Sequence, residues 1–161
     1  MKLKHYIYSV IMPFRRLYWR LLNPKTFGVK ILIRHPQNQN EILLIRHSYG
    51  NQTLWNIPGG GFNPNKELAK EAAVREVQEE VGVAVMDLQL VGEYKTSSEG
   101  KRDTVTLFAG TVSNTNFILN NEIAEFVWQD YRMVLKRTDV ARVAIRAIEA
   151  SFPSKYINPL A

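Results

Sequence analysis

Three glutamates stand close together in the middle of the chain, at a spacing that could bind a metal ion. They are Glu76, Glu79 and Glu80, and Val81 and Gly82 follow them directly. On a helix the three side chains share one face, because residues three and four positions apart lie above one another. At the end of such a helix they repel one another and also meet the negative end of its dipole. A chain selected only for folding would avoid this arrangement.

The unbalanced charge of these glutamates requires a counterion. Arg75 offsets part of it, because it lies next to Glu76 and four positions from both Glu71 and Glu79 on a helix. Carboxylate oxygens with no histidine or cysteine nearby favour hard cations, and a phosphate substrate brings further oxygen ligands. The pattern therefore indicates Mg²⁺ or Mn²⁺. A solvated acidic helix face is the alternative that the three glutamates alone leave open.

The residues around the glutamates have the spacing of a helix that would position them. Residues 67–81 carry apolar side chains at helical intervals, and a turn of one proline and three glycines, residues 58–61, precedes them. Asn65 is the expected N-cap, and Gly82 is the expected left-handed residue that ends the helix. The apolar positions are Leu68, Ala72, Ala73, Val77 and Val81.

Residues 61–83 resemble the Nudix box, the sequence signature of the Nudix hydrolases. The resemblance implies an α/β protein, with the family's α/β/α sandwich built around a mixed β-sheet. It also implies a pyrophosphohydrolase that splits a diphosphate joining a nucleoside phosphate to another moiety, whereas spacing alone reaches only a metal and phosphate site. The residues that match the fixed positions of the box are Gly61, Glu67, Arg75, Glu76, Glu79, Glu80, Gly82 and Val83.

The resemblance also implies a role for each charged residue of the box. Glu76 and Glu80 are the expected principal metal ligands. Glu79 is expected to be a further ligand or the base that activates water, and which glutamate is the base stays open. Arg75 is expected to orient these carboxylates, and Glu67 to hold the preceding loop against the helix.

Two further metal contacts follow from the same resemblance. The carbonyl of Gly60, which precedes the first glycine of the box, is expected to reach the metal. Some members of the family add a carboxylate from a loop beyond the box, and Glu122 stands six residues before Trp128 where that residue is expected. Glu122 is therefore a candidate catalytic and metal-binding residue. An ordinary loop acid is the alternative for Glu122, and Glu125 is its neighbouring competitor.

The substrate contacts are less defined, because no further motif indicates which diphosphate is cleaved. Candidate residues lie on or after the early strands, where Arg46 could grip a phosphate and Tyr49 or Trp55 could stack on a base. For Trp55, packing in the protein interior is the favoured interpretation. The full set of candidates is Arg34, Arg46, His47, Tyr49 and Trp55.

Length and composition favour a single compact domain, which the resemblance makes a Nudix hydrolase domain at residues 25–161, preceded by a basic and apolar arm or helix at residues 1–24. The chain has 161 residues, 45% of them hydrophobic, and no cysteine, which is compatible with a cytoplasmic protein that needs no disulfides. The first forty residues hold eight Lys and Arg and no acid. A helix from Phe14 onward is expected to pack on the domain or on a second subunit as a homodimer. Membrane or nucleic-acid contact through this basic arm is the less favoured alternative.

The remaining elements follow from β-rich segments and turn residues. Strands are expected at 27–34 and 41–46, joined as a hairpin, and further strands at 83–96, 103–112 and 126–128. A last helix is expected to begin at a Thr138 cap.

Two functions from different classes agree with this sequence. The first is a metal-dependent hydrolase acting on a small-molecule nucleoside diphosphate derivative. The second is a catalytically weak nucleotide-binding or RNA-binding regulatory module with the same fold.

Overall fold

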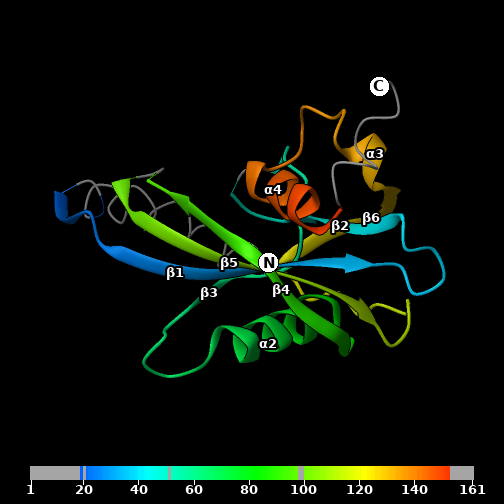
Figure 1. Cartoon of the computed structure of the whole chain (residues 1–161), viewed down its shortest axis with the longest axis horizontal. Helices are drawn as coiled ribbons and strands as arrows, with labels where there is room; N and C mark the ends of the chain where they lie inside the picture. The colour runs from blue at the N-terminus through cyan, green and yellow to red at the C-terminus, as the bar shows by residue number, and fades with distance from the viewer. Residues whose placement is uncertain (1–18, 20, 51, 98–99, 153–161) are drawn as a thin grey trace.

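The computed structural model describes residues 19, 21–50, 52–97 and 100–152. These residues form a mixed β-sheet with α2 against one face and α4 against the other (Figure 1). The predicted α/β fold with helices on both sides of the sheet is therefore confirmed. In chain order the elements are β1 (Lys25–Arg34), β2 (Glu41–His47), β3 (Gly61–Phe62), α2 (Ala69–Val81), β4 (Val85–Thr96), β5 (Arg102–Val112), β6 (Ile123–Asp130), α3 (Tyr131–Val134) and α4 (Arg142–Ser151).

The strand order is β4-β5-β1-β2-β6, with β3 paired to β1 outside this path. β1 and β5 are parallel over their whole length, and the other strand pairs are antiparallel. The predicted hairpin of β1 and β2 exists, but the register between them places only Arg34 opposite Ile42. The two strands then diverge, and β2 continues its pairing with β6 instead (Figure 1).

The segment before α2 occupies the opening between β1 and β2. The amide of Val29 donates to the carbonyl of Gly60 at 2.9 Å, and the amide of Ile31 donates to the carbonyl of Pro58 at 2.9 Å. β3 extends this contact, since Phe27 lies opposite Phe62. The glycine-rich turn is therefore hydrogen-bonded to the backbone of β1. In this position its Gly59 amide reaches Glu80, near the C-terminal end of α2.

Side chains alternate between two hydrophobic cores, as the period of a strand requires. On one face Val29, Ile31 and Ile33 pack against α2. On the other face Leu32 and Leu44 pack against α4. The two helices therefore rest on opposite sides of the same β1 backbone.

Helix α2 begins later than the sequence predicted, so Asn65 as its N-cap was wrong. The N-cap is Leu68, whose amide donates to the carboxylate of Glu71 at 2.9 Å. Asn65 lies in the preceding turn, where its amide donates to the side chain of Asn63 at 3.0 Å. The predicted end at Gly82 is confirmed, because this residue has the left-handed φ of 74°.

The C-terminal elements depart from the prediction in the same way. Helix α4 begins after Ala141 rather than at a Thr138 cap. The short helix α3 was missed, because four residues are too few to show a helical period. Asp130 caps it by accepting the amide of Arg132 at 2.8 Å.

Most of the predicted N-terminal arm, and the helix expected from Phe14, lie outside the described residues. Within the described part Trp19 is buried at 7% exposure, whereas Leu21 and Leu22 are 75% and 60% exposed. The tryptophan, rather than the two leucines, is therefore the residue of this segment that packs on the domain. Among the described helices, none has the length and apolar character needed to cross a membrane.

Candidate metal and phosphate site

A cavity of about 660 Å³ brings together the carboxylates that the sequence singled out. Helix α2 contributes Glu76, Glu79 and Glu80, and the glycine-rich turn contributes Gly60. Glu122 reaches the same cavity from the loop before β6, about forty residues later in the chain. Other residues that line it include Lys30, His47, Tyr49, Asn56, Gly59 and Lys101.

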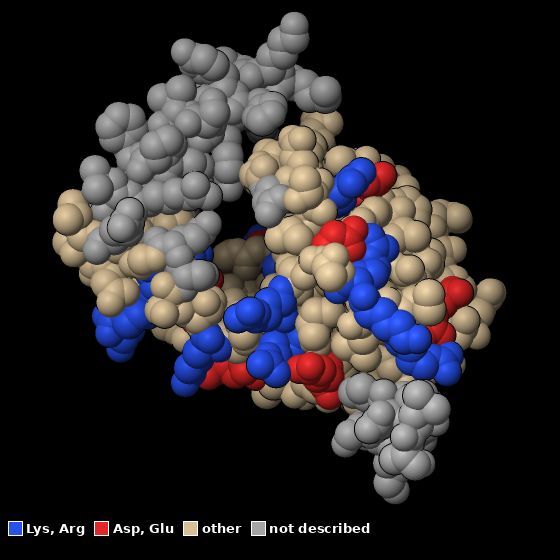
Figure 2. All heavy atoms as spheres, turned by 90° about the horizontal axis from the view of Figure 1, so that it is seen from above, with Lys and Arg blue, Asp and Glu red and all other residues tan. Residues whose placement is uncertain are grey.

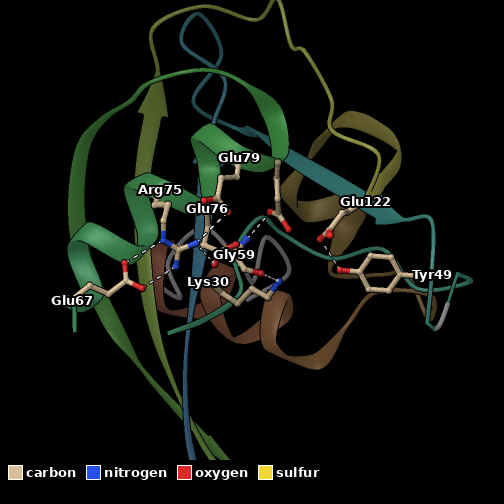
Figure 3. Close-up of polar contacts among 9 residues, drawn as sticks. Lys30, Tyr49, Gly59, Glu67, Arg75, Glu76, Glu79 and Glu122 are labelled. Carbon is tan, nitrogen blue, oxygen red and sulfur yellow. Dashed lines mark hydrogen bonds and ion pairs between the residues drawn. The ribbon is translucent and has the colours of Figure 1, made fainter. Parts of the chain in front are cut away.

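Arg75 links two carboxylates of this cavity, those of Glu76 and Glu79, to Glu67, which lies outside it (Figure 3). Its guanidinium donates to both oxygens of Glu67, at 3.0 and 3.2 Å. It also donates to Glu76 at 2.9 Å and to Glu79 at 3.2 Å. The hydrogen bonds to Glu67 raise the pKa of Arg75 above its ordinary value. The arginine therefore stays charged, and it ties the helix to the loop that carries Glu67.

Glu76 and Glu80 are buried to a degree that is rare for carboxylates, with 9% and 5% exposure. Burial raises the pKa of Glu76, and the hydrogen bond from Arg75 partly opposes this. Burial raises the pKa of Glu80 to about 7, against the opposing effects of Lys30 and of the Gly59 amide. A bound cation would therefore stabilise the charged form of both carboxylates. Glu79 differs from them, because its side chain is 56% exposed.

The turn residue Gly60 approaches the carboxylate of Glu76 very closely. A Cβ atom on Gly60 would lie 2.7 Å from each oxygen of that carboxylate. Gly59 is equally restricted, because its φ is 127° and a Cβ there would lie 2.2 Å from the carbonyl oxygen of Val29. The amide of Gly59 donates to Glu80 Oε2 at 2.8 Å. The two glycines therefore let the main chain and the buried carboxylates meet.

Lys30 is a site residue that the sequence reasoning missed. It lies in the middle of β1, and its ammonium group donates to the carbonyl oxygens of Ile57 and Gly59 at 3.0 and 2.6 Å. Burial lowers the pKa of Lys30, while Glu80 and Glu76 raise it. The available signal was a lysine flanked by the apolar residues Val29 and Ile31, in a stretch of β1 whose other side chains are buried.

The residues across the cavity from α2 belong to the β2 end and to the loop before β6. Tyr49 Oη donates to Glu122 Oε2 at 2.9 Å (Figure 3). His47 lies beside Tyr49, with ring centroids 5.6 Å apart. Burial lowers the pKa of His47 to about 4. The imidazole is therefore neutral at physiological pH and adds no charge to this wall.

Two of the candidate substrate residues, Arg46 and Trp55, lie beside the cavity and do not line it. Arg46 forms an ion pair with Glu125 and lies 5.2 Å above the Trp55 ring. Arg137 covers the same ring at 5.4 Å. Trp55 also packs against the α4-side core. This placement agrees with the packing interpretation of Trp55, and it leaves Glu125 engaged with an arginine.

A second cavity of about 860 Å³ adjoins the first. The two share Lys30, Gly60, Gly61 and Lys101. Of the acidic box residues, only Glu67 lines the second cavity, and Arg75 holds its carboxylate. The second cavity is thus an extension of the site with no free box carboxylate.

The donors in the first cavity suit a hard divalent cation, because they are carboxylate and carbonyl oxygens. Throughout the described part of the chain, no three His, Cys, Asp or Glu side chains converge closely enough to hold an ion in their present rotamers. Arg75 and Lys30 supply the positive charge to these carboxylates instead. The close contact of Glu76 with Gly60 nevertheless places a buried carboxylate beside the main chain. The residues therefore fit Mg²⁺ or Mn²⁺ after side-chain adjustment.

The chain matches the model of one protein family, described as NUDIX domain, over residues 24–149. A stretch of 69 residues is 39% identical to Diphosphoinositol polyphosphate phosphohydrolase NUDT4B of Homo sapiens. That stretch covers 42% of this chain and 36% of the human protein. The chain therefore spans about a third of the length of this relative.

Solved structures show the same architecture. The MutT protein from Methanosarcina mazei Go1 is 28% identical with a TM-score of 0.66, and the match covers 84% of this chain and 97% of that one. The NUDIX domain of Shewanella oneidensis NrtR, solved in complex with ADP ribose, is 16% identical with a TM-score of 0.66. That match covers 79% of this chain and 86% of the other, and at this identity it supports the fold alone.

Proposed function

The chain belongs to the NUDIX family, and from this we propose that it is a metal-dependent hydrolase of nucleoside diphosphate derivatives. The reaction is cleavage of the diphosphate bond to another moiety by attack of water on phosphorus. The observation that carries the proposal is one cavity that gathers Glu76, Glu79, Glu80, Glu122 and the main chain of Gly60. A purely structural helix has no reason to bury two carboxylates next to a glycine turn.

In this proposal the buried and exposed glutamates have different tasks. Glu76 and Glu80, together with the Gly60 carbonyl, hold Mg²⁺ or Mn²⁺. When bound, the ion supplies charge neutralisation of the diphosphate oxygens and lowers the pKa of a water molecule. Glu79 would accept a proton from the attacking water, because it is the exposed carboxylate of the row. Glu122 is an additional ligand or base from the opposite wall.

Arg75 and Tyr49 position these groups. Arg75 holds Glu76 and Glu79 through the hydrogen bonds that its guanidinium donates to them, at 2.9 and 3.2 Å. Tyr49 orients Glu122 through the hydrogen bond from its hydroxyl at 2.9 Å. Neutral His47 lines the same wall and is proposed to contact the substrate, since an uncharged imidazole donates a hydrogen bond from one ring nitrogen and accepts one at the other.

The adjoining cavities support a substrate with a group on each side of the diphosphate. The carboxylates lie in one cavity, and the second begins at the shared residues Lys30, Gly60, Gly61 and Lys101. A diphosphate bound over the shared residues would direct one organic group into each cavity. Nucleotide sugars, ADP-ribose and dinucleoside polyphosphates have this form.

The alternative of an RNA-binding module receives no support from the face that Figure 2 displays. There the basic side chains of the described residues are interspersed with acidic ones. Among the described basic residues several are paired, including Arg132 with Asp130 and Arg146 with Glu149, at 2.6 and 2.9 Å. The basic arm through which RNA would bind lies mostly outside the described residues, so the RNA-binding alternative stays a prediction.

A substrate panel tests the proposal. Purified protein is incubated with Mg²⁺ or Mn²⁺ and with nucleoside triphosphates, nucleotide sugars, ADP-ribose, dinucleoside polyphosphates or 5′-triphosphorylated RNA. We expect metal-dependent release of a nucleoside monophosphate from at least one substrate that carries an organic group on each side of the diphosphate. This hydrolysis should stop when the metal is chelated. Salt-sensitive RNA binding without hydrolysis of any compound would favour the binding module instead.

A further inference from the structure

Lys30 is a half-buried lysine between fully buried residues of β1, and it lines both cavities. Its neighbours in β1, Val29 and Ile31, are fully buried. Desolvation lowers the pKa of its ammonium group, which means that the surroundings disfavour the charge. A charged group in such a place is retained only where it makes contacts that offset its burial.

Among the described residues, Lys30 donates hydrogen bonds to main-chain carbonyls of residues 57–59, and the charges that act on it are carboxylates of α2. The ammonium group donates to the carbonyl oxygen of Ile57 at 3.0 Å and to that of Gly59 at 2.6 Å. These carbonyls belong to the residues on either side of Pro58. Glu80 and Glu76 are the charges that most strongly favour the ammonium form. Figure 3 shows the Lys30 side chain extended toward Gly59, beneath the row of box carboxylates.

The backbone of β1 binds the other carbonyls of the same turn. Pro58 accepts the amide of Ile31 at 2.9 Å, and Gly60 accepts the amide of Val29 at 2.9 Å. Carbonyls along residues 57–60 therefore alternate between the β1 backbone and the side chain of Lys30. Without Lys30, two of the four would lose their hydrogen bonds inside the protein.

The orientation of this turn matters because it carries two parts of the site. The Gly59 amide donates to Glu80 at 2.8 Å, and Gly60 provides the gap that the Glu76 carboxylate fills. Glycine peptides rotate easily, since no Cβ restricts their φ and ψ. The bond from Lys30 to the Gly59 carbonyl fixes the peptide that links Gly59 to Gly60. The lysine thereby fixes the main chain on which both buried carboxylates rest.

We propose that Lys30 is a positioning residue of the metal site, which holds the 57–60 turn so that Glu76, Glu80 and the Gly60 carbonyl can bind one divalent ion. This inference rests on the proposed function only for the identity of the ion. It assigns no bond-making step to Lys30. Its contribution lies in the orientation of main-chain groups, with a positive charge as a secondary effect.

The direction in which Lys30→Met changes the Mn²⁺ dissociation constant separates a positioning role from a purely electrostatic one. Lys30→Met removes both the donors and the positive charge, and methionine fits a similar volume. If Lys30 acted only as a competing cation, its removal would tighten Mn²⁺ binding. If it positions the turn, Mn²⁺ binding weakens even though a repulsive charge has gone. We expect about a tenfold increase in the Mn²⁺ dissociation constant.

The experiment measures Mn²⁺ binding by electron paramagnetic resonance without substrate, and melting temperature in the metal-free state. Lys95→Met is the matched control, because Lys95 is also on a strand but its side chain is 75% exposed and paired with Glu93. It should bind Mn²⁺ as the wild type does. A folded Lys30→Met protein with unchanged or tighter Mn²⁺ binding overturns the proposal.

A second variant covers the case in which Lys30→Met does not fold. Lys30→Arg keeps the charge, but its planar and longer fork places the donors differently. We expect Mn²⁺ binding several-fold weaker than in the wild type, and unchanged binding overturns the proposal. The hydrolase assignment is judged separately by the wild-type substrate panel. Inactivity of the wild type with intact Mn²⁺ binding would remove that assignment and leave the role of Lys30 in place.

Discussion

Helices α2 and α4 lie on opposite faces of one sheet, but they bury different kinds of side chain. The buried residues of α4 are Ala144, Ala147 and Ile148, all apolar. Helix α2 buries apolar residues too, together with Glu76 and Glu80. Two helices with apolar buried faces, like that of α4, would be enough to cover both sides of the sheet. The two buried carboxylates cost folding stability, so we infer that α2 keeps them for the proposed metal binding.

The largest contrast between the helices should appear in catalysis. We expect Glu79→Gln to lower kcat by about 10²- to 10⁴-fold, because the amide cannot accept the proton of the attacking water. Glu149→Gln is the matched control on α4, where Glu149 is exposed and paired with Arg146 at 2.9 Å. It should leave kcat unchanged. Steady-state kinetics on the substrate found in the panel measures both, and wild-type turnover by Glu79→Gln would rule out the assigned base.

The reverse contrast should appear in stability. Ile148 is fully buried on α4, so Ile148→Ala should lower the free energy of unfolding by about 2–5 kcal/mol. Because Ile148 is absent from the lining of both cavities, kcat at low temperature should change little. Urea unfolding and kinetics at 10 °C or so test the two parts. A loss of kcat without a loss of stability would break the division between the helices.

The contact between α2 and the glycine turn gives a smaller and more local effect. In Gly60→Ala the new Cβ would lie 2.7 Å from the Glu76 oxygens, and the flexible carboxylate must move away. We expect Mn²⁺ binding to weaken about tenfold while the melting temperature falls only slightly. Gly61→Ala is the control, since its Cβ would meet only the Phe27 carbonyl at 3.7 Å. Calorimetric titration with Mn²⁺ should separate the two variants, and equal affinities would contradict the proposed role of Glu76.

The last expected effect has the opposite sign, because removing a buried charge should increase stability. The pKa of Glu80 is raised from 4.5 to about 7, so its stabilising contribution is full below pH 4.5 and is lost as the pH rises through 7. Glu80→Gln should therefore match the wild type at pH 4 and be more stable by about 1–3 kcal/mol at pH 8, without metal. Urea unfolding in a chelator at both pH values measures this. A variant that is less stable at pH 8 would show that the Glu80 charge stabilises the fold.

Short-range patterns in the sequence were sufficient to place the carboxylates. The helical spacing around Glu76 and Glu80 and the stop at Gly82 depend on residues within a few positions of one another, and all are in the structure. The N-cap was wrong because the 63–67 turn absorbs Asn65, and sequence spacing does not show where such a turn gives way to the helix.

Contacts between distant segments could not be read from the sequence in the same way. Lys30 was counted only as one of several basic residues, since its partners Ile57 and Gly59 lie 27 and 29 positions away. The expected hairpin of β1 with β2 missed that β1 pairs mainly with β5, as in the register of Lys25 with Arg102. The opening created by this pairing is the space that holds the glycine turn and the proposed metal site.

The central claim is that the buried carboxylates of α2 and the glycine turn bind one divalent ion for diphosphate hydrolysis. The most direct test is a crystal soaked in Mn²⁺, with anomalous scattering used to locate the metal. We predict a manganese peak in contact with Glu76, Glu80 and the carbonyl oxygen of Gly60. The claim is contradicted if manganese is found only elsewhere, while Glu76 remains bound to Arg75 and Glu80 to the Gly59 amide.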